Sequence, residues 1–445
     1  MVPRAPHPAR LAIKCNKILT DLRRRITANL WPPGGQLPTR EELEKKYKAS
    51  SRTVQRALTQ LINDGFVRAD GRRGTFVVDH PPHLSNYGLV FPFCPSQSDW
   101  SGHWEALTTA ARTIMGGKPG TITQYYGMES PSNTAAYETL LADVCSHRLA
   151  GLVFSSPPYL LAKTPVLLEK GIPRVAVMAP GMFPNVGAVV YDADSYVRKA
   201  LDYLAGHGCR RIGIIQHSSQ RSEDTEAHRK LLQQIAARGL GLQPHWVQGV
   251  TPHTPGLTRN LVELLMRRPK ADRPDGLLVT DDNIVTDVAA GLLAAGVNVP
   301  DQLRVVAHAN FPCPPPAAVP VWYLGYDMAE VLHLAMAYID CARRGDTPAE
   351  PMVVPARCKD DLIERADVDA KLQRIGGNDR CQLAALEPLL HHDARFARKR
   401  AVVRVSQRLR LPFVEQQCDP LAEAAVVGEQ QRGAVAGDDA LQLAH

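Results

Sequence analysis

The chain has 445 residues, more than one compact core accommodates, so we expect two or more domains. Its formal charge of +7 is unevenly distributed: residues 1–80 hold 16 Lys and Arg against 7 Asp and Glu, a balance of +9, so the remainder sums to −2. A basic segment joined to a near-neutral body indicates a polyanion-binding head and a body with a different task.

Cysteine spacing and apolar runs exclude several classes of protein. The nine Cys are scattered and form no CxxC pair, which indicates neither a zinc site nor a disulfide framework and favours reduced thiols. Residues 1–17 lack the continuous apolar run of a secretory signal. The longest mostly apolar segment, Val288 to Val297, is too short to span a bilayer. We therefore expect a cytoplasmic protein without a membrane contact.

The basic head begins with two predicted helices, after a flexible start at residues 1–13. Apolar residues recur at three- and four-residue steps between residues 14 and 28, namely Leu19, Leu22 and Ile26. The Trp-Pro-Pro-Gly-Gly sequence at 31–35 ends this helix. Thr39 with Glu42 three residues later fits a capping box and predicts that the second helix begins at Arg40.

A third helix with a basic outer face follows the second. Ser50 or Ser51 can cap it. Its predicted buried stripe is Val54, Ala57, Leu58, Leu61 and Ile62. Its outer face carries Arg52, Gln55, Arg56 and Gln60, and such side chains can form hydrogen bonds with base edges or phosphates. Strands at 66–68 and 75–78 around the glycine-tipped turn 70–74 predict a wing.

The order of these elements is that of a winged helix-turn-helix domain over residues 14–79. A charge run alone is usually a solvated surface. Here, however, several motifs in register resemble the GntR family of bacterial transcription regulators, at residues 32–34, 37–40, 51–54, 57–58 and 73–77. The resemblance implies dimeric binding to two DNA half-sites, with contacts from Arg40, Ser51, Arg52, Thr53, Gln55 and Arg56 and a wing tip of Arg72, Arg73 and Gly74.

The body alternates short apolar runs with longer amphipathic segments after a polar, Pro-rich stretch at 80–86, which we interpret as a linker. The apolar runs are 87–93, 121–126, 151–155, 174–178, 211–215, 276–280 and 303–307. Helices are predicted at 103–115, 133–147, 194–206, 225–238, 257–268, 285–295 and 328–344. This alternation predicts two parallel α/β sheets with helices on both faces.

Parallel α/β sheets bind ligands beyond the carboxyl ends of their strands. Polar residues recur there, and the candidate effector contacts are Ser96, Gln97, Trp100, Ser155, Ser156, Asp192, Asp281, Asp282 and Asn310. A single residue of this kind is more often a cap or a surface residue, so the recurrence carries the argument. No Ser-His-Asp set, metal-spaced histidine group or P-loop stands out, so we predict no catalytic residue, no metal and no cofactor.

Residues 87–360 resemble the effector-binding half of the LacI family, which has the two-lobed type I periplasmic-binding-protein fold. The matching stretches include 151–153, 171–173, 206–213, 274–276, 296–300 and 303–306. Ala309 occupies a position where sugar-binding members usually have Asp, and Asp281-Asp282 replaces their usual Asn-Asp. The resemblance implies a small-molecule effector, and these departures leave open whether it is a sugar. Further candidates are His217, His228 and His308.

The combined pattern predicts an α/β protein with a winged helix-turn-helix head. A GntR-like head on a LacI-like body is similar to the arabinose-responsive bacterial repressors, and it implies a homodimeric repressor whose affinity for double-stranded operator DNA changes when a small molecule binds. An alternative is a GntR-headed protein with an aminotransferase-like body that holds pyridoxal phosphate, but Lys199 and Lys230 lie on amphipathic helices. A third is an architectural DNA-binding protein with an inert body.

The C-terminal segment 361–445 resembles neither family. It includes a basic run at 394–410, for which a second nucleic-acid contact is conceivable. A solvated or disordered extension is the simpler interpretation of its composition.

Overall fold

The computed structural model describes residues 8–115, 120–128, 135–218, 226–346 and 351–362. Residues 1–7 of the start predicted to be flexible at 1–13 lie outside these ranges, as do residues 363–445 of the tail predicted at 361–445, with its basic run at 394–410, and the first residues of the helices predicted from 133 and 225. The flexible start is wrong for residues 8–13, because they are helical and continuous with the first predicted helix. None of the helices within the described ranges is both long and apolar enough to cross a membrane.

The N-terminal domain packs three helices around a small apolar core. They are α1 (Pro8–Thr27), α2 (Arg40–Tyr47) and α3 (Ser51–Asn63). The predicted capping box is confirmed, because Glu42 N donates to Thr39 Oγ1 at 3.3 Å and Thr39 N donates to Glu42 Oε2 at 2.8 Å. Ser50 caps α3. The core includes Leu22, Leu43, Val54, Leu61 and Phe66.

A two-stranded antiparallel wing follows these helices. β1 (Val67–Asp70) pairs with β2 (Gly74–Val77), and a 3-10 turn at Gly71–Arg73 forms the tip. The first strand extends two residues beyond the predicted end at 68, because Ala69 and Asp70 continue the pairing. The segment before α2 also joins the wing, since Leu37 N donates to the carbonyl of Thr75 on β2 at 2.8 Å.

The segment predicted to be a linker is partly helical. It contains α4 (Pro82–Ser85), and the first strand of the body, β3 (Asn86–Val90), follows directly. Pro82 lies in the first turn of this helix, where the missing backbone N–H would have had no helical partner.

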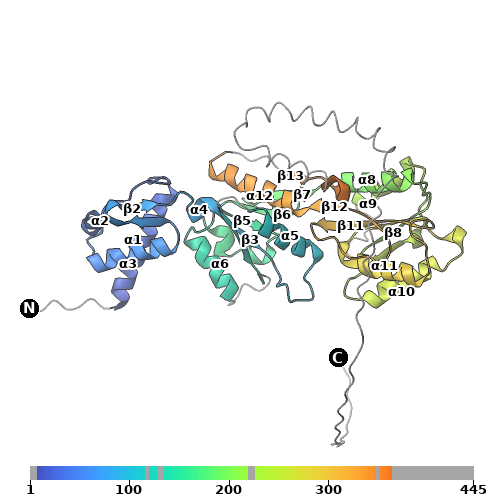
Figure 1. The fold of residues 1–445 in the computed structure, drawn as a ribbon, viewed down its shortest axis with the longest axis horizontal. Coiled ribbons are helices and arrows are strands. Elements are labelled where there is room, and N and C mark those ends of the chain that lie inside the picture. The colour runs from blue at the N-terminus through green and yellow to red at the C-terminus, as the bar shows by residue number, and fades with distance from the viewer. Residues whose placement is uncertain (1–7, 116–119, 129–134, 219–225, 347–350, 363–445) are drawn as a thin grey trace, which may run out of the picture. The chain divides into compact units, whose positions relative to one another are not determined.

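The first lobe is a six-stranded parallel sheet with strand order β13-β7-β6-β5-β3-β4. Its further strands are β4 (Thr121–Tyr125), β5 (Gly151–Phe154), β6 (Arg174–Val177), β7 (Gly187–Tyr191) and β13 (Met352–Val354). Its helices are α5 (Gly102–Thr113), α6 (Ala135–Cys145), α7 (Pro165–Leu168) and α12 (Met328–Arg343), with a 3-10 turn at Tyr159–Leu161. α5 and α12 cover one face and α6 covers the other (Figure 1).

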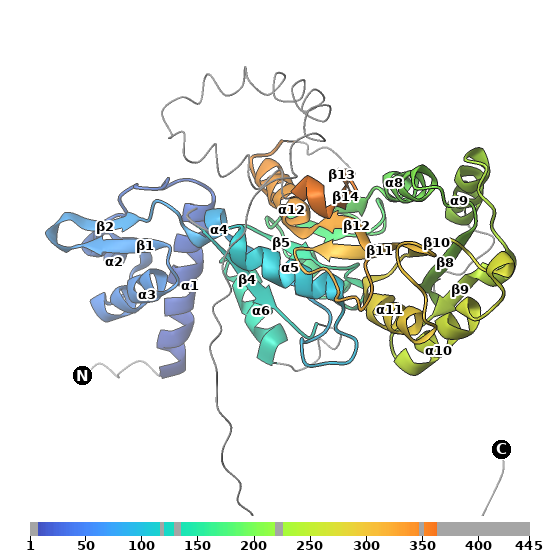
Figure 2. The ribbon, with the colours of Figure 1, turned by 45° about the vertical axis from the view of Figure 1, so that its right-hand side comes forward.

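The second lobe is a six-stranded sheet with strand order β14-β12-β11-β10-β8-β9, parallel except at β14. Its strands are β8 (Ile212–His217), β9 (Val247–Val250), β10 (Gly276–Val279), β11 (Arg304–Phe311), β12 (Trp322–Asp327) and β14 (Arg357–Cys358). Its helices are α8 (Ala193–Gly206), α9 (Glu226–Ala237), α10 (Pro255–Met266) and α11 (Val285–Ala294), with 3-10 turns at Pro244–Trp246, Lys270–Asp272 and Asp282–Ile284. Figure 2 shows α8 and α9 on one side of this sheet and α10 and α11 on the other.

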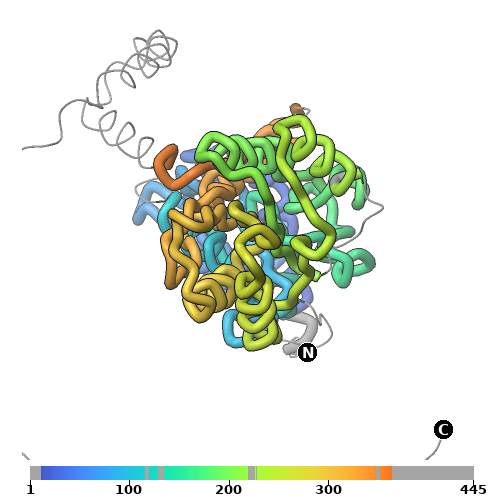
Figure 3. The backbone as a smooth tube through the Cα atoms, turned by 90° about the vertical axis from the view of Figure 1, so that its right-hand side faces the viewer, coloured from blue at the N-terminus to red at the C-terminus, as the bar shows by residue number. Residues whose placement is uncertain are grey.

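The chain passes between the two lobes three times. It crosses after β7, returns after β12 into α12, and crosses again between β13 and β14. In Figure 3 the orange tube of α12 therefore lies beside the cyan tube of α5, although more than 200 residues separate them in sequence. The two sheets predicted from the sequence are confirmed, and the lobes are built from discontinuous segments.

Each predicted apolar run contains a strand, but five strands were not predicted. β9, β13 and β14 have two to four residues each, and β7 and β12 follow irregular segments. The expectation that the strand near 303–307 ends before His308 is wrong. β11 runs to Phe311, because its pairing with β12 continues as far as Phe311 opposite Asp327.

We expect Gly325→Ala to destabilise the protein. A Cβ atom at Gly325 of β12 would lie 1.7 Å from the carbonyl oxygen of Ala309 on β11, so the two strands would have to separate. We expect the free energy of unfolding in urea to fall by about 3 kcal/mol, the upper range for overpacking.

Gly256→Ala on α10 is the matched control, because a Cβ there meets nothing within 4 Å. Alanine in a helix should change the free energy of unfolding by no more than about 1 kcal/mol, in the stabilising direction. Equal effects of the two substitutions would contradict the close approach of β11 and β12.

Candidate functional site

One side of the N-terminal domain carries a polar groove of about 610 Å³ between α2 and α3. Its walls are Arg40, Ser51, Arg52, Gln55, Arg56, Thr59 and Gln60. On α3 the exposed residues alternate with the buried stripe, because residues three and four apart share one helix face. The groove gathers Arg and Gln side chains on one helix, and these are the donors that read base edges in a major groove.

Thr53 does not lie on this polar face. It is 4 % exposed, and its Oγ1 lies 2.9 Å from Ser50 Oγ at the start of α3. Its environment is that of a helix cap, in contrast to Arg52 and Gln55 beside it, which are exposed. The structure therefore brings five of the six predicted helix contacts together, and it adds Thr59 and Gln60 to them.

The wing tip is held in shape by a residue outside the wing. Gly74 has φ +119°, a conformation that side-chain-bearing residues rarely adopt. Gln36 Nε2 donates to the carbonyl of Arg73 at 2.8 Å, and a Cβ at Gly74 would lie equally close to that nitrogen. Arg72 and Arg73 are exposed beside it. Sequence reasoning missed Gln36, because its bond spans 37 positions and no local pattern reports it.

The two lobes of the body meet around a buried carboxylate. Asp282, 5 % exposed, follows β10 and accepts a hydrogen bond from Asn310 Nδ2 on β11 at 2.7 Å. Asp281 caps the same turn, since its Oδ1 accepts from Asn283 N at 2.8 Å. The opposite lobe closes this cluster, because Gly102 N at the start of α5 donates to Asn283 Oδ1 at 2.9 Å. Burial raises the pKa of Asp282.

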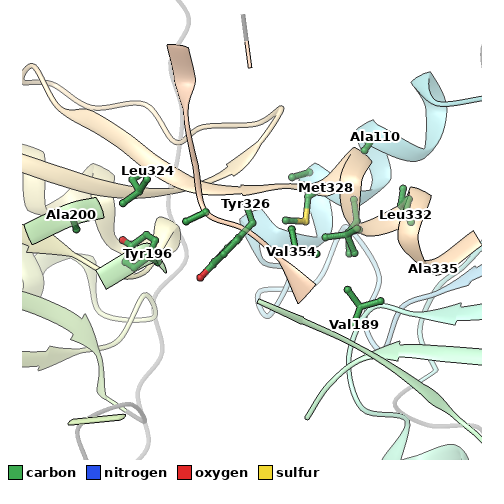
Figure 4. Close-up of a cluster of buried hydrophobic side chains, with 14 of the residues drawn as sticks. Ala110, Val189, Tyr196, Ala200, Leu324, Tyr326, Met328, Leu332, Ala335 and Val354 are labelled. Carbon is green, nitrogen blue, oxygen red and sulfur yellow. The ribbon is translucent and has the colours of Figure 1, made fainter. Parts of the chain in front are cut away.

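A chain of aromatic rings from both lobes lies near the buried carboxylate of Asp282. Tyr191 at the end of β7 stacks on Tyr326 of β12, with ring centroids 4.3 Å apart. Tyr326 also contacts His308, which meets Tyr196 edge to face at 5.3 Å. On the other side Tyr191 Oη lies 3.3 Å from His103 Nδ1. Figure 4 shows Tyr196 and Tyr326 within the surrounding hydrophobic core.

Three buried polar atoms of the residues in and around this cluster have no hydrogen-bond partner: Ser155 Oγ, Tyr196 Oη and His308 Nδ1. An unpaired buried polar atom costs about 1–3 kcal/mol, so such atoms mark places where a ligand or ordered water is expected. Burial lowers the pKa of His308 to about 4 and also lowers the pKa of His103, so both rings are neutral near pH 7. Among the described residues, no three His, Cys, Asp or Glu gather to hold a metal ion.

The remaining predicted effector contacts lie outside this cluster. Ser96 is exposed, and Gln97 closes a turn within its own loop. Trp100 packs against neighbouring aromatic rings and donates to a carboxylate on α5. Ser156 lines an apolar cavity, and Asp192 caps α8. The structure brings together Ser155, Asp281, Asp282 and Asn310 of the predicted set.

Sequence reasoning missed three side chains of this cluster, His103, Tyr196 and Tyr326, and it named Tyr191 only as a strand end. His103 and Tyr196 lie in the first turn of helices that follow strands, at α5 and α8. The signal for these two was present, because the first turn after a parallel strand faces the same edge of the sheet as the strand end. Tyr191 ends β7 and Tyr326 lies next to the last residue of β12, and the apolar pattern identified neither strand.

Sequence comparison matches both parts of the chain to known families. Residues 14–77 match the model for bacterial regulatory proteins of the gntR family. Residues 201–362 match the model for a periplasmic binding protein-like domain. Because the second match is to a periplasmic binding protein-like domain, nothing supports the alternative of an aminotransferase-like body that holds pyridoxal phosphate.

Two curated relatives cover different lengths of the chain. The arabinose metabolism transcriptional repressor of Halalkalibacterium halodurans is 22 % identical over 316 residues, 66 % of this chain and 80 % of the relative. The uncharacterized HTH-type transcriptional regulator YurK of Bacillus subtilis is 36 % identical over 67 residues, 15 % of this chain and 26 % of the relative.

Solved structures of LacI-family regulators are similar to part of the chain. A LacI regulator from Lactobacillus casei with bound Tris is 21 % identical and covers 62 % of this chain and 95 % of its own, with a TM-score of 0.45. A LacI-family regulatory protein from Chloroflexus aggregans is 18 % identical and covers 61 % and 96 %, with a TM-score of 0.48.

The DNA-binding head and the two-lobed body define a ligand-responsive transcription regulator. Its head, at residues 14–77, is similar to the bacterial regulatory proteins of the gntR family, and residues 201–362 of its body are similar to a periplasmic binding protein-like domain. This class rests on the two family matches and on the arabinose repressor relative, whose match extends well beyond the head.

We expect Arg52→Ala to weaken binding to the operator by about 1–3 kcal/mol if Arg52 reads a base. The side chain is exposed in the polar groove of α3. A gel shift with DNA from upstream of the protein's own gene measures the change. Arg24→Ala removes an exposed arginine of α1 that does not line the groove and should change affinity little. Equal loss in both variants would contradict a specific role for Arg52.

Acidification should destabilise the protein through His308. The unfolded chain takes up a proton near the ordinary histidine pKa of 6.5, whereas the folded protein does so only near pH 4. Between these values the unfolded state binds more protons. The free energy of unfolding therefore decreases by roughly 1.4 kcal/mol for each unit by which the pH is lowered.

Denaturant unfolding between pH 7.5 and 4.5 measures this slope. His308→Gln should reduce it by about that amount, and the exposed His207→Gln should leave it unchanged. A slope unaffected by His308→Gln would show that His308 is not held neutral by the fold.

Proposed function

We propose that the protein is a non-enzymatic, cytoplasmic repressor that binds operator DNA as a homodimer and responds to a small polyhydroxylated molecule in the cleft between the lobes. The predicted DNA contacts are Arg40, Ser51, Arg52, Gln55 and Arg56, with the wing residues Arg72, Arg73 and Gly74. Thr53 positions α3 as part of its cap.

One observation carries the effector part of this proposal: three buried polar atoms in the cleft lack partners. Two belong to α8 and β11 in the second lobe, and Ser155 follows β5 in the first. A molecule with several hydroxyl groups can donate to and accept from all three, as well as from Asp282 and Asn310. The arabinose repressor relative supports a sugar as the first class to test.

The DNA part of the proposal requires a dimer, because two heads can engage two half-sites related by two-fold symmetry. Light scattering of the full chain gives the molar mass. The regulatory step requires an effector that binds the DNA-competent and DNA-incompetent states with different affinities. The operator must then change effector affinity by the same factor.

The test uses thermal shifts of the full chain with pentoses, hexoses, sugar acids and nucleosides, followed by titration of the best compound. Ser155→Ala should leave the melting temperature of the free protein almost unchanged, since Ser155 Oγ bonds nothing. The substitution should lower the affinity for the compound by roughly fivefold to a hundredfold, the equivalent of about 1–3 kcal/mol.

Thr258→Val is the matched control, because Thr258 Oγ1 is also buried and unpartnered but lies on α10, outside the cleft cluster. Its affinity for the compound should equal that of the wild type. Equal weakening by both substitutions would place the ligand elsewhere. No shift with any compound, together with normal DNA binding, would favour an architectural protein with an inert body.

A further inference from the structure

An apolar cavity of about 310 Å³ lies at the carboxyl edge of the first-lobe sheet. Its volume falls in the range of small-molecule sites. Most of the side chains that line it are apolar, and the polar groups among them are those of Ser156, Trp104 and Tyr159. Four aromatic side chains contribute to the walls: Phe93, Trp104, Phe154 and Tyr159. A ring-sized apolar group therefore finds both aliphatic and aromatic partners in this cavity.

Residues that line the cavity directly follow residues of the polar cluster between the lobes. His103 reaches the cleft, with its Nε2 3.4 Å from the carbonyl of Ser155, and the next residue, Trp104, lines the cavity. The two residues that follow β5 show the same arrangement: Ser155 has an unpartnered Oγ, and the next residue, Ser156, lines the cavity. Adjacent Cα atoms are about 3.8 Å apart, so the two environments are one residue from each other at two places.

The rim of the cavity exposes apolar side chains. Tyr159 is 61 % and Leu160 is 60 % exposed, and both also line the cavity. Adjoining exposed apolar residues around a concave surface are typical of binding sites. A molecule whose polar end replaces the missing partners of the cleft would direct a substituent toward this cavity.

We propose that the effector carries an aryl group, which occupies this apolar cavity while its hydroxyl groups bind the polar cleft. The inference rests on the proposed function, since it assumes that the cleft binds the effector. It deepens that function by specifying an amphipathic, aryl-substituted polyol rather than a free sugar. The aryl ring packs among the aromatic walls, where offset and edge-to-face contacts are available.

The test compares methyl and phenyl glycosides of arabinose, galactose and glucose by titration calorimetry with the full chain, and adds benzyl alcohol as a ring-only probe by saturation-transfer NMR. We expect the phenyl glycoside to bind at least tenfold more tightly than the methyl glycoside of the same sugar. Ser156→Trp, which fills the cavity, should reduce this ratio to within twofold and abolish the benzyl alcohol signal.

Ser146→Trp is the matched control, because Ser146 is also half-buried but precedes β5, at the opposite edge of the sheet. It should retain the phenyl preference and the benzyl alcohol signal. If Ser156→Trp does not fold, Trp104→Leu, which removes one aromatic wall, should lower the phenyl preference at least threefold.

Equal affinity for phenyl and methyl glycosides would overturn the aryl proposal and leave the proposed function standing. If no glycoside binds but the benzyl alcohol signal is present and lost in Ser156→Trp, the cavity is an aryl site and the polyol part of the proposed function fails. Absence of both glycoside binding and a benzyl alcohol signal would overturn the aryl proposal as well.

Discussion

The structure depends on how the chain crosses between the two lobes. Tyr191 is the last residue of β7, directly before the first crossing, and Tyr326 lies next to the last residue of β12, before the second crossing. The rings of these two tyrosines stack with their centroids 4.3 Å apart. The third crossing joins them, because Asp192 N donates to the carbonyl of Val354 at 2.9 Å. The three crossings therefore contact one another, as segments that connect two lobes do in proteins whose domains move about a hinge.

The buried Asp282 is the chemical counterpart of this hinge. A carboxylate loses hydration on burial and stays charged only when hydrogen bonds replace it. Asn310 and Asn283 each donate to it, at 2.7 and 3.1 Å. The family that the sequence resembles usually has a second carboxylate at the position of Ala309, and this chain lacks it. A cleft with one buried carboxylate, two amides and several tyrosines suits hydroxyl groups better than an anion.

The fold could largely be predicted from the sequence, and the site could be predicted in part. Caps such as Thr39 and long amphipathic helices are local signals, and the structure contains them at the predicted places. Strands of two to four residues, such as β13, carry too few residues for a pattern and form only because a long-range neighbour is already in place. For the same reason Gln36 and Tyr326 could not be assigned, since their partners lie far away in sequence. Thr53 illustrates the reverse case, where a residue next to exposed contacts faces inward.

The unpartnered atoms of the cleft also bear on whether an effector can operate the switch. Moving a two-state equilibrium from 1:99 to 99:1 requires a differential binding energy of about 5.5 kcal/mol. Each orphaned atom among Ser155, Tyr196 and His308 represents about 1–3 kcal/mol that a bound hydroxyl group would recover. Three such atoms together reach the required size, whereas one alone does not. A ligand that satisfies a single atom would therefore bind without switching, and the response depends on a molecule that reaches both lobes at once.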